Sequence, residues 1–128
     1  MTGMYPSRTN LTDWIPGWGK QYGSFPLLPP KWTQHLEQQH TSLAEALHHA
    51  GYTTQHLGKW HLGGTGDLPE DHGFDVNIGG SIRRLPKSYH FPYGGEAMKW
   101  HSSLPESQRE GRYLTNRLAD EAVAQPPR

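Results

Sequence analysis

The strongest hydrophobic pattern in this chain lies between residues 42 and 50. Four apolar residues recur there at the spacing i, i+3, i+4 and i+7, which places them on one stripe of a helix: Leu43, Ala46, Leu47 and Ala50. Ser42 and Glu45 form the Ser-x-x-Glu pattern of a capping box at the start of this helix. Gly51 follows where a left-handed residue would end it. We therefore predict a helix over 42–50.

A run of β-forming residues follows this helix, from Tyr52 to Leu57, and predicts a strand over 52–57. A helix, a glycine turn and a strand in this order form half of an α/β unit. A last helix is predicted from about 113 to 124, where apolar residues again recur at helical spacing: Leu114, Leu118 and Ala122. On this helix we expect Arg117 and Glu121 to face outward.

Proline and glycine interrupt the two remaining long stretches, residues 1–33 and 64–110. Proline fixes φ and removes a backbone donor, so we expect neither a helix nor a sheet ladder to run through 1–33. Residues 64–110 are likewise predicted to form loop. Acidic residues scattered in the second stretch are expected to act as turn formers and helix caps: Asp67, Glu70, Asp71 and Asp75.

Composition restricts the classes of function. Hydrophobic residues make up 33% of the 128 residues, against roughly 45–50% in globular chains by a count that includes glycine. We therefore expect a small core, built around some of the five tryptophans. The formal net charge is zero and no Lys/Arg run exists, which argues against nucleic acid as a partner. No apolar stretch approaches the about 20 residues that span a bilayer. The absence of cysteine excludes thiolate metal sites and disulfides within the chain.

Lys59 and His61 are the candidate catalytic residues. If the strand continues through them, both side chains point to one face and Trp60 points to the other. Ligands of open α/β sheets bind beyond the carboxyl ends of the strands, which is where this pair falls. A lysine beside a histidine suits an anionic tetrahedral group, because one supplies charge and the other exchanges a proton. Spacing alone leaves open that the two are merely solvated loop residues.

Residues 42–63, which contain Gly-Lys-Trp-His-Leu-Gly at 58–63, resemble the second signature region of the formylglycine-dependent sulfatases. Three other stretches agree in order. Residues 1–9 resemble the stretch just after the modified-cysteine motif of that family, and residues 69–80 resemble the loop that follows the second signature. Residues 110–122 resemble the helix that precedes a later core strand. The resemblance therefore spans nearly the whole chain.

This resemblance implies an α/β fold in which residues 1–128 form part of an alkaline-phosphatase-like sulfatase domain, of the N-terminal catalytic type and truncated at both ends. A mixed or parallel sheet with flanking helices and long loops is expected. The implied activity is hydrolysis of a sulfate ester, on a small molecule or carbohydrate, through a formylglycine nucleophile and calcium. By position, Lys59 would contact sulfate oxygens, and His61 would hydrogen-bond the formylglycine hydroxyl. Ser81 would touch the substrate, although a plain loop serine is an equal alternative.

The departures from the family pattern are as informative as the matches. The chain has no cysteine, so the modified cysteine and the paired calcium-binding aspartates would lie before Met1. Further metal ligands and a second lysine would lie beyond Arg128. We therefore expect no metal ligands in this chain and no activity from it alone. A phosphonate or phosphate ester hydrolase of the same superfamily, a non-catalytic remnant and a histidine-rich zinc module stay open as alternatives. No secretory signal follows Met1, and the compartment is left open.

Overall fold

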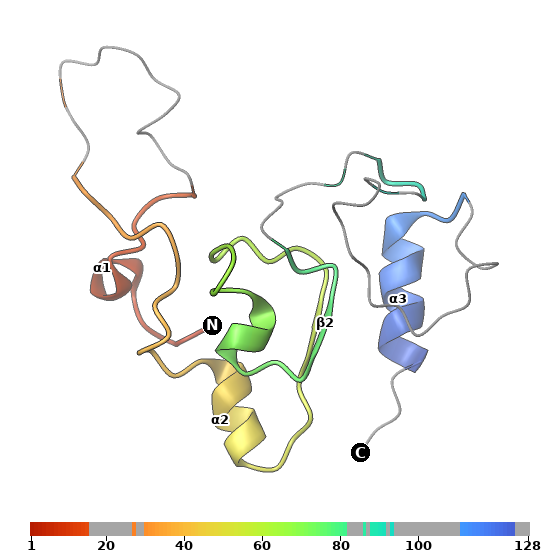
Figure 1. Cartoon of the computed structure of the whole chain (residues 1–128), viewed down its shortest axis with the longest axis horizontal. Helices are drawn as coiled ribbons and strands as arrows, with labels where there is room; N and C mark the ends of the chain where they lie inside the picture. Colours follow the sequence, from red (N-terminus) through yellow and green to blue (C-terminus); the bar gives the residue numbers. More distant parts are fainter. Residues whose placement is uncertain are drawn as a thin grey trace.

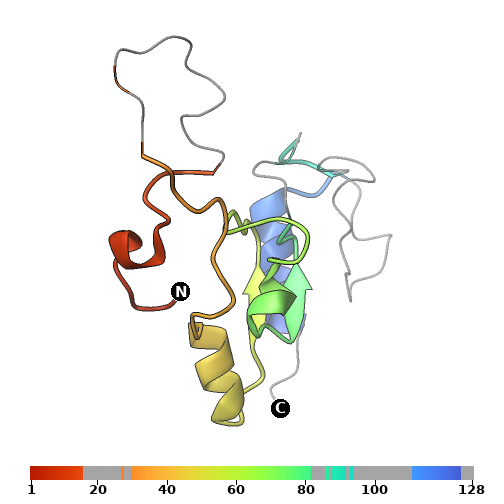
Figure 2. The same cartoon turned by 60° about the vertical axis from the view of Figure 1, so that its left-hand side comes forward.

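The computed structural model describes residues 1–15, 27, 30–81, 86, 88–91, 93 and 111–124. Its elements, in chain order, are α1 (Pro6–Thr9), α2 (Leu43–His49), β1 (Gln55–Leu57), the 3₁₀ helix η2 (Pro69–His72), β2 (Val76–Ile78) and α3 (Leu114–Ala124). The two strands run parallel, with Gln55 opposite Val76 and Leu57 opposite Ile78. Figure 1 and Figure 2 show this small sheet between η2 on one side and α3 on the other. The described residues thus form the α/β arrangement that was expected, on a small scale.

The helix predicted over 42–50 is confirmed as α2. The Ser42 hydroxyl accepts the N–H of Glu45 at 3.0 Å, and the Glu45 carboxylate accepts the N–H of Ser42 at 2.6 Å, which completes the capping box. At the other end Gly51 takes a φ of +86°. The N–H of Tyr52 then reaches the carbonyl of Leu47 at 3.0 Å, as in the glycine-ended caps common in proteins. Local sequence is enough to define both ends of this helix.

The apolar stripe of α2 is exposed in the described part of the chain. Leu43 is 60% exposed and Leu47 is 37% exposed, and Ala46 and Ala50 are exposed as well. The helix instead buries Ala44, together with the N-cap residue Ser42. The predicted stripe therefore exists as a pattern, but no described element covers it.

The predicted strand over 52–57 is shorter in the structure, because Thr54 bonds to Asp75 rather than extending the ladder. The N–H of Thr54 donates to the Asp75 carboxylate at 2.7 Å, and the Thr54 carbonyl accepts the N–H groups of Asp75 and Val76 at 3.0 and 3.1 Å. Regular pairing begins only at Gln55. The first half of the predicted strand is thus the connection that places β1 beside β2.

Three short elements lie where the sequence predicted only loop, and those predictions were wrong. The helices α1 and η2 each place a proline, Pro6 or Pro69, at the first helical position, where its missing N–H costs nothing. Strand β2 forms because β1 offers it a parallel partner. A strand of three residues has too little pattern of its own to be recognised in a glycine- and proline-rich stretch.

The last helix is confirmed, as Leu114–Ala124, but its orientation differs from the prediction. Arg117 is 2% exposed and Glu121 is 0% exposed, so both face inward. The Arg117 Nε lies 2.9 Å from the Glu121 Oε1, and this pairing offsets the cost of burying two charges. Ala122 is exposed instead. No helix within the described ranges is long and apolar enough to cross a membrane.

A group of aromatic rings packs on the η2 side of the sheet. Trp60 is 7% exposed, and its ring centroid lies 5.2 Å from that of His56, 5.5 Å from that of His72 and 6.1 Å from that of Phe74. Of the other tryptophans, Trp14 is exposed and Trp32 is half-buried, while positions 18 and 100 lie outside the described residues. Among the described tryptophans, Trp60 alone is a core residue.

Candidate functional site

The candidate site is the loop that follows β1. The strand ends at Leu57, the N–H of Gly58 donates to the Ile78 carbonyl at 2.8 Å, and the φ of Gly58 is +101°. The chain therefore turns out of the sheet before Lys59. The strand on which the predicted shared face of Lys59 and His61 depended does not continue through them, and His61 has a φ of +79°.

Trp60 anchors this loop from within the core. Its indole N–H donates to the carbonyl of Asp67 at 2.6 Å, while its ring packs in the aromatic group described above. The buried indole satisfies its single donor in this way. The flanking residues Lys59 and His61 are consequently held in place by a fixed residue between them.

Lys59 is exposed, and within the described part of the chain its ammonium makes no hydrogen bond and no ion pair. Its main chain is nonetheless fixed, since Gly58 is bonded to β2 and Trp60 is buried. A cation without a partner on a fixed backbone is free to neutralise an anionic ligand.

His61 is half-buried, and its Nε2 lies 2.6 Å from the carbonyl oxygen of Ile15. Its Nδ1 makes no hydrogen bond within the described residues. The next residue is tied as well, because the carbonyl of Leu62 accepts the N–H of Leu36 at 2.7 Å. The imidazole is thus positioned by two distant segments and keeps one nitrogen for other chemistry. The contact with Ile15 has no sequence signal, because it is made by a backbone atom.

Ser81 lies three residues beyond the end of β2. Because β1 and β2 are parallel, the chain leading to Lys59 and the chain leading to Ser81 leave the sheet at the same edge. The turn before Ser81 is built by Asn77, whose side chain accepts the N–H of Gly80 at 2.9 Å and donates to its carbonyl at 2.8 Å. A side chain on Gly80 would come within 2.8 Å of the His56 Nδ1, so this turn requires glycine.

The acidic residues predicted to form turns and caps are engaged in local structure. Three accept a side-chain hydrogen bond: Glu70 from Asn77, Asp71 from Leu68 and Asp75 from Thr54. Asp67 takes part through its main chain, whose N–H donates to the Gly64 carbonyl at 2.8 Å. Within the described ranges, no group of three or more histidine, aspartate or glutamate side chains is placed to hold a metal ion. The oxygen-rich donor set that calcium prefers is therefore not assembled by these residues.

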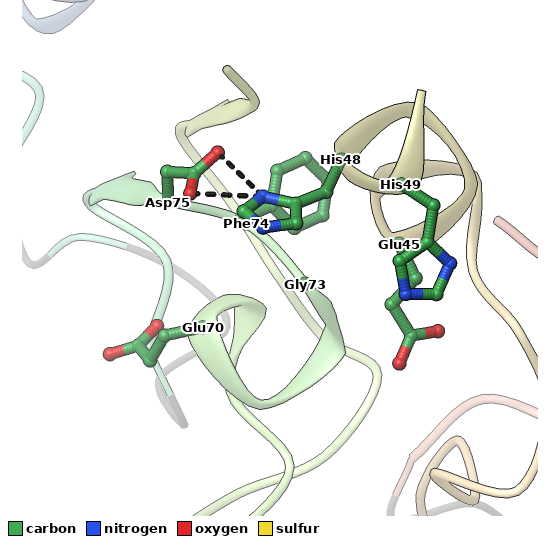
Figure 3. Close-up of a pocket in the computed structure, with 7 residues that line it drawn as sticks. All are labelled: Glu45, His48, His49, Glu70, Gly73, Phe74 and Asp75. Carbon is green, nitrogen blue, oxygen red and sulfur yellow. Dashed lines mark hydrogen bonds and ion pairs between the residues drawn. The ribbon is translucent and has the colours of Figure 1, made fainter. Parts of the chain in front are cut away.

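A separate cavity of about 230 Å³ opens between α2 and the segment that joins η2 to β2. Figure 3 shows His48 pointing across it toward Asp75, with Nδ1 and Oδ1 3.1 Å apart. The backbone N–H of Thr54 lowers the pKa of Asp75 below its usual value, burial opposes this, and His48 adds to it. Neither Lys59 nor His61 lines this cavity. The contact joins residues 27 positions apart, and no local pattern in the sequence predicted it.

Two comparisons with known proteins agree with the resemblance carried by residues 42–63. A family model described as Sulfatase matches residues 1–126. An arylsulfatase of Hemicentrotus pulcherrimus is 34% identical over 103 residues, which cover 74% of this chain and 17% of that protein. The chain therefore spans under a fifth of the length of this relative.

Proposed function

This chain belongs to the sulfatase family, and we propose that it contributes the loop at Lys59 and His61 to an enzyme that hydrolyses sulfate esters. The observation that carries the proposal is that the loop at the carboxyl end of a parallel strand holds both Lys59, whose ammonium has no partner among the described residues, and His61, whose imidazole is tethered at Nε2. That edge is where open α/β sheets bind their ligands.

Lys59 is proposed to contact the sulfate oxygens. Transfer of the sulfuryl group places negative charge on these oxygens and on the leaving group, and a fixed cation stabilises charge that develops in the transition state. Lysine suits this task as a compact point charge. Its exposed side chain has the freedom to reach a ligand that lies outside the sheet.

His61 is proposed to exchange a proton with the hydroxyl group of the nucleophile. An imidazole can both accept and donate a proton, and one that is already oriented can transfer protons without first losing rotational freedom. The bond from Nε2 to the Ile15 carbonyl supplies that orientation. Ser81 is proposed to donate its hydroxyl proton to a substrate oxygen, on the ground that it leaves the sheet at the same edge as Lys59.

The formylglycine nucleophile and the calcium ion belong to the proposal for the whole enzyme and not to these residues. The chain contains no cysteine from which formylglycine could form, and its described acids are not assembled into a metal site. Both groups would come from other segments. We therefore expect the purified 128-residue chain to show no turnover of an aryl sulfate in the presence of calcium.

The relative is an arylsulfatase, so an aryl sulfate is the substrate class to test first. The experiment is a composite enzyme in which this chain replaces the matching segment of that arylsulfatase. Lys59→Ala should lower kcat about 10²–10³-fold, as removal of one preorganised donor does. His61→Ala should lower it roughly 10²–10⁴-fold and change the pH–rate profile.

Two exposed residues supply matched controls. Lys31→Ala and His49→Ala remove the same charge types elsewhere on the surface, and should leave kcat unchanged. Activities of both site variants within about threefold of the composite parent, in folded protein, contradict the roles given to Lys59 and His61. Faster turnover of an aryl phosphate than of an aryl sulfate would favour the phosphate ester hydrolase alternative.

A further inference from the structure

We infer that the main-chain carbonyl of Ile15 is a positioning group that holds His61 as the Nε2–H tautomer, so that Nδ1 is the nitrogen that exchanges protons. The role of Nδ1 rests on the proposed function. The tautomer does not, because it follows from contacts within the chain.

The chemistry of the contact decides which nitrogen carries the proton. The His61 Nε2 lies 2.6 Å from the Ile15 oxygen, and a carbonyl oxygen can only accept a hydrogen bond, so Nε2 must donate. A neutral imidazole has one N–H. Nδ1 therefore bears a lone pair, and it makes no hydrogen bond within the described residues. A proton carrier requires such a nitrogen.

The backbone of His61 aims its ring at Ile15. A φ of +79° lies in the left-handed region that residues with a side chain rarely adopt, and such strain persists only where the surroundings impose it. Bonds on both sides impose it here. The indole of Trp60 is held by the Asp67 carbonyl at 2.6 Å, and the Leu62 carbonyl is held by the N–H of Leu36 at 2.7 Å.

The segment that presents the carbonyl is braced in turn. The N–H of Leu11 reaches the Pro6 carbonyl at 3.1 Å, and the N–H of Thr33 reaches the Asn10 carbonyl at 2.8 Å. The residue after Ile15 is a proline, which restricts Ile15 itself to extended backbone. Residues 46 positions apart are thereby brought together as one unit.

The direct test is nitrogen NMR of the chain with ¹⁵N-labelled histidine at pH 8. The signals of His61 are identified by their loss in His61→Gln. We expect a protonated Nε2 and an unprotonated Nδ1, with the full separation of a single tautomer. Exposed His49 is the internal reference and should show the averaged shifts of two tautomers. A protonated Nδ1 at His61, or shifts averaged as at His49, would overturn the inference.

Two substitutions of His61 distinguish the hydrogen bond of Nε2 to Ile15 from the proton exchange at Nδ1. The amide nitrogen of glutamine reaches the position of Nε2, and that of asparagine reaches the position of Nδ1. His61→Gln should therefore keep the thermal midpoint of the chain, whereas His61→Asn should lower it by several degrees through loss of the bond to Ile15. Asparagine is itself favoured at a positive φ, so His61→Ala, which has no donor, is the reference. A His61→Gln midpoint no higher than that of His61→Ala would overturn the inference.

The same pair of variants in the composite enzyme tests the role of Nδ1. Both should lose kcat about 10²–10⁴-fold, because neither amide carries a proton. Retained activity in both contradicts the proposed function and the role of Nδ1 with it, while the tautomer is still decided by the NMR measurement. A positioning role also predicts that Pro16→Gly, which frees the backbone of Ile15, lowers kcat more than it raises KM. Pro30→Gly makes the same substitution at an exposed position and should change neither.

Discussion

The Ser42 hydroxyl donates a hydrogen bond to the carbonyl oxygen of His72, and the two oxygens are 2.6 Å apart. The same hydroxyl accepts the N–H of Glu45 at 3.0 Å. One buried hydroxyl therefore starts α2 and fastens it to the end of η2. At this junction the ring of His72 packs against that of Trp60, which lies between Lys59 and His61, with 5.5 Å between the two ring centroids.

Replacement of Ser42 by alanine should destabilise the chain more than loss of an ordinary helix cap. The cap itself contributes about 1 kcal/mol, and the buried His72 carbonyl would also lose a partner, at a cost of roughly 1–3 kcal/mol. The free energy of unfolding, measured in urea, should fall by about 2–4 kcal/mol in total. Thr41→Ala is the control, since Thr41 is exposed, and a loss of equal size there would contradict the prediction.

Gly73 packs against the backbone of Glu45, in the first turn of α2, at the same junction. It has a φ of +85°, and an added Cβ would lie 2.8 Å from the backbone nitrogen of Glu45. Gly73→Ala should therefore combine backbone strain with a clash against a main-chain atom. Gly51→Ala provides the comparison, because Gly51 has a φ of +86° and open space around it. We expect about 1–2 kcal/mol of destabilisation at Gly51 and a clearly larger loss at Gly73. Equal losses in urea unfolding would show that the clash is relieved.

The buried pair on α3 should be sensitive to loss of one partner. Glu121→Ala leaves the Arg117 guanidinium buried without its carboxylate, which costs about 3–5 kcal/mol. That is enough to unfold a protein of marginal stability. The double replacement of both residues by methionine should cost much less, since no charge is left in the interior.

A second ion pair, between Asp120 of α3 and Arg112 just before this helix, provides the control. Both side chains are partly exposed, so Asp120→Ala should cost under about 1 kcal/mol. The free energies of unfolding in urea are compared for Glu121→Ala, the double methionine variant and Asp120→Ala. A Glu121→Ala loss no larger than the Asp120→Ala loss would indicate that water reaches Arg117.

Acid should weaken the fold through its buried histidines. Burial lowers the pKa of His72 below the usual histidine value, and the nearby carboxylates, Asp67 first, oppose this only in part. Burial also lowers the pKa of His56. A lowered pKa in the folded state means that the unfolded chain binds the proton first. Stability contributed by these neutral rings is therefore complete above about pH 6.5 and falls as the pH drops below it.

Urea midpoints at pH 7.5 and pH 5.5 measure this effect. The midpoint should be lower at pH 5.5, and His72→Phe, which keeps an aromatic ring but cannot titrate, should reduce the difference. His49→Gln, at an exposed position on α2, should leave it unchanged. A difference between the two pH values that is the same with and without His72 would rule out this residue as the source.

Local signals allowed part of the fold to be predicted. The capping box and glycine end of α2 are interactions within a few residues, so reading Ser42, Glu45 and Gly51 in order was sufficient. Strand β2 could not be predicted in the same way. Its three residues become a strand through pairing with β1, and that pairing is visible only when both segments are placed in space.

For the candidate site too, part could be predicted from the sequence and part could not. The sequence by itself determined the family, through the segment around Lys59, Trp60 and His61. A motif of fixed residue types at fixed spacing can be recognised without knowledge of the structure. Only the tertiary structure decided that the strand stops at Leu57 and that His61 turns to the carbonyl of Ile15. Contacts between residues far apart in the chain, often through backbone atoms common to every residue type, leave no trace in the order of side chains. The free-energy cost of a strained backbone or of a buried charge is offset by contacts with other residues, and a local sequence pattern does not show those contacts.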